Sequence, residues 1–181
     1  MRIHSQTAGV TLTAQQPLND SVRVAYQALA AVLGGTQSLH TNGFDEALAL
    51  PTERAAKIAL RTQQIVAYET DLLDYGDIFD GSVEIERKVE QLKDQARAEL
   101  AKLQAMGGAV AAIDYMKEAL IASNAARVAA IEKGEQVLVG VNSYTETEPS
   151  PLQASGIEGI LTVPESVEIG QITALQAWRR D

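Results

Sequence analysis

The stretch GGTQSLHTNGFDEALALPTERAAKIALR, residues 34–61, indicates how the chain folds. It reads as a short strand over residues 36–40, a polar loop, and a helix from about 52 to 69. Gly34-Gly35 and Asn42-Gly43 bound the strand, as turn-forming residues commonly do. Pro51-Thr52 marks the helix start, because threonine is a good N-cap and proline fits a first turn. The stretch therefore predicts one β/α unit.

The residues before this stretch predict a second unit of the same kind. Residues 1–7 read as a strand and residues 8–18 as a loop. Asn19 or Asp20 is then the expected cap of a helix whose apolar residues recur at spacings of three and four. Gly34-Gly35 ends that helix. Strands joined by helical crossovers are typical of a parallel sheet, and six further units would be needed to close a barrel.

The rest of the chain reads as mostly helical. An amphipathic helix is expected over residues 83–105, with acidic and basic residues four apart on its outer face and Gly107-Gly108 at its end. Two further helices are expected, over residues 109–121 and from Ser123 or Asn124 to Gly134. Residues 136–143 read as a buried strand in which Asn142 is a turn residue.

The C-terminal part reads as a linker and a last helix. TETEPSPLQASG is the expected linker, and residues 160–163 the expected short strand. Pro164 is expected to open the helix, with an apolar side formed by Val167, Ile172, Leu175 and Trp178.

Composition excludes several classes of function. The net charge is -9, and it arises in residues 71–181, because residues 1–70 hold five basic and five acidic residues. Without a basic face, nucleic-acid binding is not expected. The chain has no run of 18 apolar residues, a polar start without the features of a signal peptide, and 0 cysteines. We expect a cytoplasmic protein with no membrane span.

The sequence offers few groups for acid–base or metal chemistry. His4 and His40 are the only histidines, and neither stands among carboxylates at metal-ligand spacing. We interpret both as hydrogen-bonded residues at strand ends and expect no protein metal site. Asp45 and Glu46 are adjacent and would diverge by about 100° on a helix, so they do not form a general acid–base pair. Asp45 reads as a helix N-cap or first-turn acid.

Five segments carry a resemblance to a known family, namely MRIHSQTAGVTLTAQQP, GGTQSLHTN, FDEALALPTE, GGAVAAIDYM and GVNSYTETEPSP. Together they resemble the adenosylcobalamin-dependent acyl-CoA mutases, that is, methylmalonyl-CoA mutase and its ethylmalonyl relative. The resemblance implies an α/β fold: the last (β/α) units of a TIM-type barrel followed by a mostly helical tail with one or two short strands. Residues 1–70 would be the partial barrel, residues 71–145 a helical segment ending in a strand, and residues 146–181 a linker and helix.

The resemblance also implies which residues face the ligands. Gln6 and Gln37 are expected at the carboxyl ends of their strands, which line the mouth of a barrel. It implies acyl-CoA contacts for Gln6, Gln37 and Ser38, although the two glutamine amides could instead merely tie loops together. No residue of this chain is assigned a catalytic role.

The cofactor contacts implied by the resemblance involve Gln6, Gly9, Glu46 and Ala49. A small residue such as Gly9 or Ala49 is needed where backbone approaches the flat corrin. The Glu46 carboxylate would accept hydrogen bonds from the adenosyl ribose, since it can take two hydroxyl donors.

The chain does not contain everything that the family needs. The DxHxxG motif that ligates cobalt is absent, as are the upstream strands of the barrel. The segment DIFDGSVE also departs from the methylmalonyl pattern towards the ethylmalonyl branch. We therefore expect a part of a mutase that is cut within a larger fold. It would act on an acyl-CoA with adenosylcobalamin only when joined by the remaining barrel and a cobalamin-binding domain.

The alternative is a non-catalytic truncated or helical interaction protein derived from such a mutase. In either case the chain alone is expected to be inactive and poorly stable. Its sheet edges, and apolar side chains facing the barrel interior, would lack partners.

Overall fold

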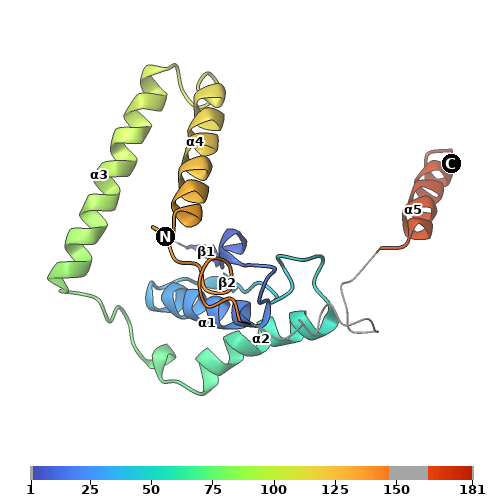
Figure 1. Cartoon of the computed structure of the whole chain (residues 1–181), viewed down its shortest axis with the longest axis horizontal. Helices are drawn as coiled ribbons and strands as arrows, with labels where there is room; N and C mark the ends of the chain where they lie inside the picture. The colour runs from blue at the N-terminus through green and yellow to red at the C-terminus, as the bar shows by residue number, and fades with distance from the viewer. Residues whose placement is uncertain (1, 147–162, 181) are drawn as a thin grey trace. The chain divides into compact units, whose positions relative to one another are not determined.

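The computed structural model describes residues 2–146 and 163–180. These residues fall into two units, residues 2–74 with 163–180 and residues 75–146. Within them the chain is a mixed α/β protein, mostly helical, with a two-stranded parallel sheet (Figure 1). The expected α/β class and the parallel pairing are therefore confirmed.

The sheet belongs to the first unit and consists of β1 (His4–Gln6) and β2 (Ser38–His40). Both strands are shorter than the sequence predicts. His4 pairs with Ser38, Ser5 with Leu39, and Gln6 with His40. Paired residues of neighbouring strands point to the same side of a sheet, so this register decides which side chains share a face.

Helix α1 (Leu18–Leu33) joins the two strands. It begins directly after Pro17, so the prediction that Asn19 or Asp20 caps it was wrong. Pro17 suits the start of a helix because its missing N–H would have had no helical partner. At the other end, Gly35 adopts φ +77°, and the amide of Thr36 donates to the Ala31 carbonyl. This is a Schellman ending and confirms the predicted stop.

Helix α2 (Glu53–Tyr68) follows β2 and begins as the sequence predicts. The Thr52 hydroxyl caps it by accepting a hydrogen bond from the Ala55 amide at 3.2 Å. The first turns of α2 pack against the preceding loop, where Phe44 and Ala55 form a buried cluster. Leu48 and Ile58 pack around that cluster. Two short 3₁₀ helices, η1 (Gly9–Thr11) and η2 (Leu72–Asp74), complete this part of the unit.

The second unit contains two long helices, α3 (Val83–Ala105) and α4 (Ile113–Glu132). Gly107 (φ +99°) and Gly108 (φ +96°) follow the end of α3, as predicted. Helix α4 is continuous where two helices were predicted. The expected caps Ser123 and Asn124 lie inside it, because one serine and one asparagine cost too little propensity to end an alanine-rich helix.

The charged side chains of α3 form ion pairs between residues three apart, where the sequence suggested pairs four apart. The pairs are Glu84–Arg87, Glu90–Lys93, Asp94–Arg97 and Glu99–Lys102. Because these side chains are largely exposed, water screens the charges, and the pairs are expected to contribute little to stability.

The predicted buried strand over residues 136–143 is wrong, because this segment is a tight loop. Asn142 closes it, as its Oδ1 accepts from the Leu138 amide and its Nδ2 donates to the carbonyls of Ile131 and Gln136, each at 2.8 Å. Gly140, between Leu138 and Asn142 in the sequence, adopts φ +82°. Asn142 is therefore the turn residue that the sequence predicts, and its side chain takes over hydrogen bonds that a neighbouring strand would have supplied.

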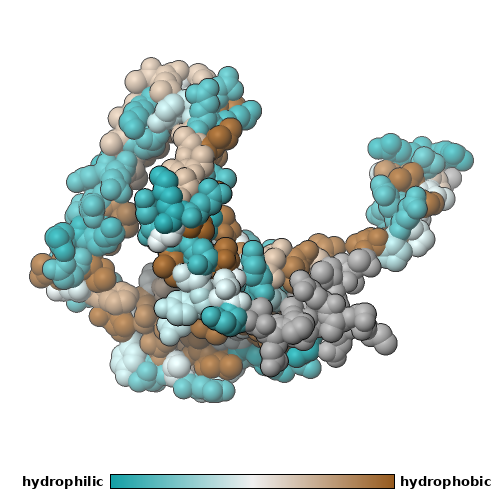
Figure 2. All heavy atoms as spheres, viewed as in Figure 1, coloured by the Kyte–Doolittle hydropathy of each residue, from teal (hydrophilic) through white to brown (hydrophobic). Residues whose placement is uncertain are grey.

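Helix α5 (Glu165–Trp178) begins after Pro164, as predicted, and its side chains are exposed. The predicted linker apart from its first two residues, and the predicted strand over residues 160–163 apart from its last residue, lie outside the described residues. Hydrophobic side chains are visible among hydrophilic ones on the surface of the chain (Figure 2). No helix within residues 2–146 and 163–180 is long and apolar enough to cross a membrane.

Candidate functional site

One face of the parallel sheet is open and polar. His4, Gln6, Ser38 and His40 are exposed on it, whereas Ser5 and Leu39 point to the opposite, half-buried face. The open face of these two strands therefore carries polar side chains. His4 Nδ1 lies 2.9 Å from Ser38 Oγ, so the prediction of a hydrogen-bonded histidine is confirmed for His4.

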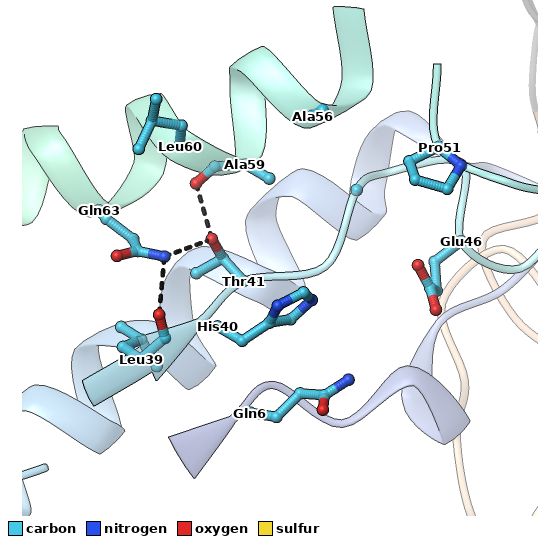
Figure 3. Close-up of a pocket in the computed structure, with 11 residues that line it drawn as sticks. Gln6, Leu39, His40, Thr41, Glu46, Pro51, Ala56, Ala59, Leu60 and Gln63 are labelled. Carbon is cyan, nitrogen blue, oxygen red and sulfur yellow. Dashed lines mark hydrogen bonds between the residues drawn. The ribbon is translucent and has the colours of Figure 1, made fainter. Parts of the chain in front are cut away.

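A groove of about 480 Å³ lies at the carboxyl ends of the strands (Figure 3). Gln6, His40 and Glu46 supply polar side chains to its lining. Residues of α2 and the segment before it supply its apolar part, namely Pro51, Ala56, Ala59 and Leu60. A largely apolar concavity with a few convergent polar groups is the usual form of a small-molecule site.

Gln63 covers the free edge of β2 within this groove. Its Nε2 donates to the Leu39 carbonyl at 3.1 Å and to the Thr41 hydroxyl at 3.0 Å, and that hydroxyl donates to the Ala59 carbonyl at 2.8 Å (Figure 3). These bonds attach β2 to α2. They also occupy the Leu39 carbonyl, which could otherwise accept a hydrogen bond from an adjacent strand.

The predicted position of Gln37 was wrong. Gln37 precedes β2, so it lies at the opposite end of the strand from the groove. Its Oε1 accepts from the Ile3 amide at 2.6 Å, and its Nε2 donates to the Gly35 carbonyl. The alternative interpretation, an amide that ties backbone segments together, describes this residue. Gln6, by contrast, is the last residue of β1 and lies at the groove as predicted.

The structure brings Gly9 and Glu46 together, although they are 37 positions apart in the sequence. A Cβ placed on Gly9 would lie 3.8 Å from Glu46 Cγ and 3.1 Å from Asn42 Nδ2. Asn42 is buried, and its Oδ1 accepts from the Thr7 hydroxyl at 2.7 Å. The same hydroxyl accepts from the Asn42 amide at 2.9 Å. Thr7 and Asn42 therefore cross-link the loops that follow the two strands.

Asp45 and Glu46 diverge, as the sequence predicts. Glu46 is exposed in the groove, while Asp45 is 2% exposed. The prediction that Asp45 caps a helix or occupies its first turn was wrong in detail, because its Oδ2 accepts from both the amide and the hydroxyl of Thr52 at 2.9 Å. Asp45 Oδ1 is buried without a hydrogen-bond partner among the described residues. Ala49 closes the same turn, as its amide donates to the Asp45 carbonyl.

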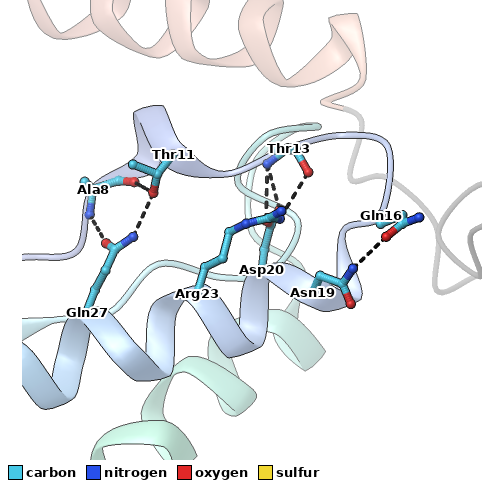
Figure 4. Close-up of polar contacts among 8 residues, drawn as sticks. All are labelled: Ala8, Thr11, Thr13, Gln16, Asn19, Asp20, Arg23 and Gln27. Carbon is cyan, nitrogen blue, oxygen red and sulfur yellow. Dashed lines mark hydrogen bonds and ion pairs between the residues drawn. The ribbon is translucent and has the colours of Figure 1, made fainter. Parts of the chain in front are cut away.

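Asp20 anchors the far end of the loop that carries Gly9 (Figure 4). It is 0% exposed, and both carboxylate oxygens accept from the Thr13 amide. Arg23 Nη1 lies 2.6 Å from Asp20 Oδ1. Burial raises the pKa of Asp20 above its ordinary 3.8, and the hydrogen bonds from Arg23 and Thr13 oppose that rise without cancelling it.

The raised pKa of Asp20 predicts an unusual pH dependence. The folded chain holds this proton more tightly than the unfolded chain, so the contribution of Asp20 to stability is complete below pH 3.8 and declines as the pH rises through the folded pKa. The difference in unfolding free energy between the wild type and Asp20→Asn should therefore become less favourable to the wild type from pH 3.8 upwards. Urea titrations at several pH values measure it, with the exposed Asp77→Asn as control. A flat or rising difference would contradict the prediction.

Some residues of the site were missed by sequence reasoning. His40 was treated only as a strand-end residue, yet it lines the groove together with Gln6 and Glu46 (Figure 3). Gln6 pairs with His40, and this pairing places His40 at the groove. The sequence alone does not reveal the strand register on which the pairing depends. Thr7 lies next to Gln6 in the sequence, and Asn42 was noted only as part of a polar loop.

Comparison with known proteins shows that nearly the whole chain is similar in sequence to members of one family. Residues 1–181 match the family model described as methylmalonyl-CoA mutase. The chain is 48% identical to the ethylmalonyl-CoA mutase of Cereibacter sphaeroides over 177 residues, which is 96% of the chain and 27% of that protein. Against the methylmalonyl-CoA mutase of the same organism, identity is 42% over 181 residues, covering 99% of the chain and 25% of that protein.

A third relative is more distant. The methylmalonyl-CoA mutase of Escherichia coli is 39% identical over 183 residues, covering 100% of the chain and 25% of that protein. The chain thus spans about a quarter of the length of these relatives.

Proposed function

Since the chain belongs to the methylmalonyl-CoA mutase family, we propose that it forms part of a coenzyme B12-dependent carbon-skeleton mutase. The substrate would be a branched acyl-CoA of the methylmalonyl or ethylmalonyl type. The observation that carries the proposal is the groove at the carboxyl ends of the parallel strands, which Gln6 and Glu46 help to line, with Gly9 next to Glu46. The activity requires the remainder of the barrel and a cobalamin-binding domain.

Residues 1–70 are proposed to be the last (β/α) units of a TIM-type barrel. The support is that the sheet carries polar side chains on its open face, while Leu39 on the other face lies near Val32 of α1 and Val66 of α2. In such a barrel the open face lines the interior, and ligands bind at the carboxyl ends of the strands. Residues 71–145 would be an outer helical segment, and residues 146–181 a linker with its helix.

The residues present fit adenosylcobalamin at this end of the sheet. Gly9 provides backbone with no side chain, and a Cβ there would meet Asn42 and fill space next to Glu46. A flat macrocycle can approach such a backbone closely. The exposed Glu46 carboxylate can accept hydrogen bonds from two hydroxyl groups. Gln6 and Ala49 are the other proposed contacts, and Ala49 lies in the same turn as Glu46.

For the acyl-CoA, we propose contacts with Gln6 and Ser38. Both lie on the open face of the sheet, one at each end, so an extended ligand could run along that face. Gln37 is not retained, because backbone groups already engage both ends of its amide.

When bound, adenosylcobalamin supplies the radical chemistry by which the carbon skeleton is rearranged. This chain would bind and orient the two ligands and help to keep water from them.

A non-catalytic interaction protein is the second candidate. Exposed apolar residues on α3 favour it, among them Leu92 and Leu100. The groove does not favour it, because an adaptor has no use for the polar side chains of Gln6 and Glu46 in one place.

Co-purification of the tagged chain from its native host tests the proposal. Recovery with a longer mutase-like chain and with corrin absorbance is expected, followed by turnover of methylmalonyl- or ethylmalonyl-CoA. Recovery of the chain alone, or with chaperones only, would contradict it and favour the non-catalytic candidate.

Glu46→Gln separates binding from folding. Loss of the charge should weaken adenosylcobalamin binding by the assembled enzyme roughly 10- to 100-fold, because hydrogen bonds to charged groups contribute about 1.5–3 kcal/mol. Since Glu46 is exposed, the unfolding free energy should change by less than about 0.5 kcal/mol. Equilibrium dialysis and thermal unfolding measure the two effects, with Glu86→Gln in α3 as control. Unchanged affinity would remove Glu46 from the site.

A further inference from the structure

The loop between β1 and α1 carries Gly9 and is held at three points. At its start, Thr7 is cross-linked to Asn42. At its end, the amide of Thr13 is held by Asp20. Between these points a third contact comes from Gln27, which projects from α1 towards the loop (Figure 4).

Gln27, Ala8 and Thr11 are joined to one another by three hydrogen bonds. Gln27 Oε1 accepts from the Ala8 amide at 2.5 Å, and Nε2 donates to the Thr11 hydroxyl at 2.7 Å. That hydroxyl in turn donates a hydrogen bond to the Ala8 carbonyl at 2.7 Å. An amide N–H can only donate, so the side-chain oxygen must face Ala8 and the nitrogen must face Thr11. If the amide oxygen and nitrogen of Gln27 exchanged places, a hydrogen bond would be lost.

These bonds bracket Gly9. Ala8 directly precedes Gly9, and Thr11 ends the 3₁₀ turn that Gly9 begins. The position of Gly9 relative to Asn42 and Glu46 therefore depends on Gln27. The space there is narrow, since a single Cβ on Gly9 would come within 3.1 Å of Asn42 Nδ2.

Gln27 contributes little to the core. It is half-buried, whereas Val24 and Ala28 of the same helix are buried. Asp20, in contrast, is fully buried on the same helix. The two side chains that hold the loop thus differ: Asp20 is part of the packed interior, and Gln27 is a contact between helix surface and loop.

We propose that Gln27 is a positioning residue of the ligand site, which holds the backbone of Gly9 in place beside Asn42 and Glu46. The identity of that ligand as adenosylcobalamin rests on the proposed function. The hydrogen bonds that link Gln27 to Ala8 and Thr11 do not depend on that function.

Two variants and one control test the inference. Gln27→Met preserves the length of the side chain and removes both hydrogen bonds. Gln27→Glu keeps the acceptor for Ala8 and loses the donor to Thr11. Gln91→Met removes an exposed glutamine of α3 that contacts only Lys88 among the hydrogen bonds identified. Each is compared with the wild type by amide hydrogen exchange of the chain, thermal unfolding, and affinity of the assembled enzyme for adenosylcobalamin.

Gln27→Met should accelerate exchange of the Ala8 amide roughly fivefold to tenfold, as expected for one lost net hydrogen bond, with little change at Thr13. Its affinity for adenosylcobalamin should fall about tenfold or more, whereas the unfolding midpoint should stay within about 3 °C of the wild type. Gln27→Glu should keep the Ala8 amide protected and lose less affinity. Gln91→Met should behave as the wild type.

The outcomes separate this inference from the proposed function. If the wild-type assembly does not bind adenosylcobalamin, the proposed function fails and the role assigned to Gln27 fails with it. If the wild type binds and Gln27→Met binds equally well, only the inference is overturned. It is also overturned if exchange at Ala8 is unchanged, or if the midpoint falls in proportion to affinity, because Gln27 would then be a structural residue.

Discussion

Replacing Phe44 with alanine is expected to lower the free energy of unfolding by about 3–5 kcal/mol. Phe44 is 2% exposed and packs with Ala55 of α2, with Leu48 and Ile58 around them. Loss of its ring leaves a cavity that these neighbours cannot fill, since Ala55 is small and fixed in the first turn of a helix. This is the largest stability effect expected for a single substitution in the first unit.

Phe79→Ala supplies the matched control. Phe79 is the other of the two phenylalanines, and it is half-buried beside α3 in the second unit. Its loss should cost clearly less, because part of its ring is already in water. Chemical denaturation of both variants measures the difference. Equal losses would show that the Phe44 cluster is not the core of the first unit.

Asp45→Ala is expected to cost about 3 kcal/mol, because two hydrogen bonds from Thr52 to a buried carboxylate are lost. The Thr52 amide would also be left without its acceptor. Under the proposed function the effect should extend to cofactor binding, because Asp45 is adjacent to Glu46. Once the turn is detached from α2, Glu46 no longer has a fixed position, and the affinity of the proposed assembly for adenosylcobalamin should fall by at least as much as in Glu46→Gln.

Two comparisons isolate this effect. Thr52→Ser keeps the hydroxyl that bonds Asp45 and caps α2, so it should be close to the wild type. Asp77→Ala removes an exposed aspartate that also accepts from a backbone amide, that of Phe79, and should cost less than about 1 kcal/mol. Denaturant titration and equilibrium dialysis measure both effects. A stable Asp45→Ala variant with unchanged affinity would contradict the proposed role of the turn.

Local features of the sequence predicted most helices and their ends. Thr52 was identified as an N-cap, Gly34-Gly35 as a helix stop and Gly107-Gly108 as another. Such signals depend on a few neighbouring residues, so they can be found without knowledge of distant contacts. The errors occurred where local signals were weak: helix α4 continues through Ser123 and Asn124, because each costs only a few tenths of a kcal/mol.

The prediction of a strand over residues 136–143 failed for a different reason. Apolar β-branched residues suit a strand only if a neighbouring strand pairs with them. Here the Asn142 side chain supplies the hydrogen bonds instead, and no pattern of apolar residues could reveal that.

The sequence by itself determined the two β/α units, the family, and Gln6, Gly9 and Glu46 as candidate residues, because motif and capping signals are local. Only the tertiary structure decided which of them meet. The strand register put His40 next to Gln6 and moved Gln37 to the opposite end of β2. Contacts between residues some 35 positions apart, such as Thr7 with Asn42, set the distance from Gly9 to Glu46. Such contacts depend on how the units pack and leave no local mark in the sequence.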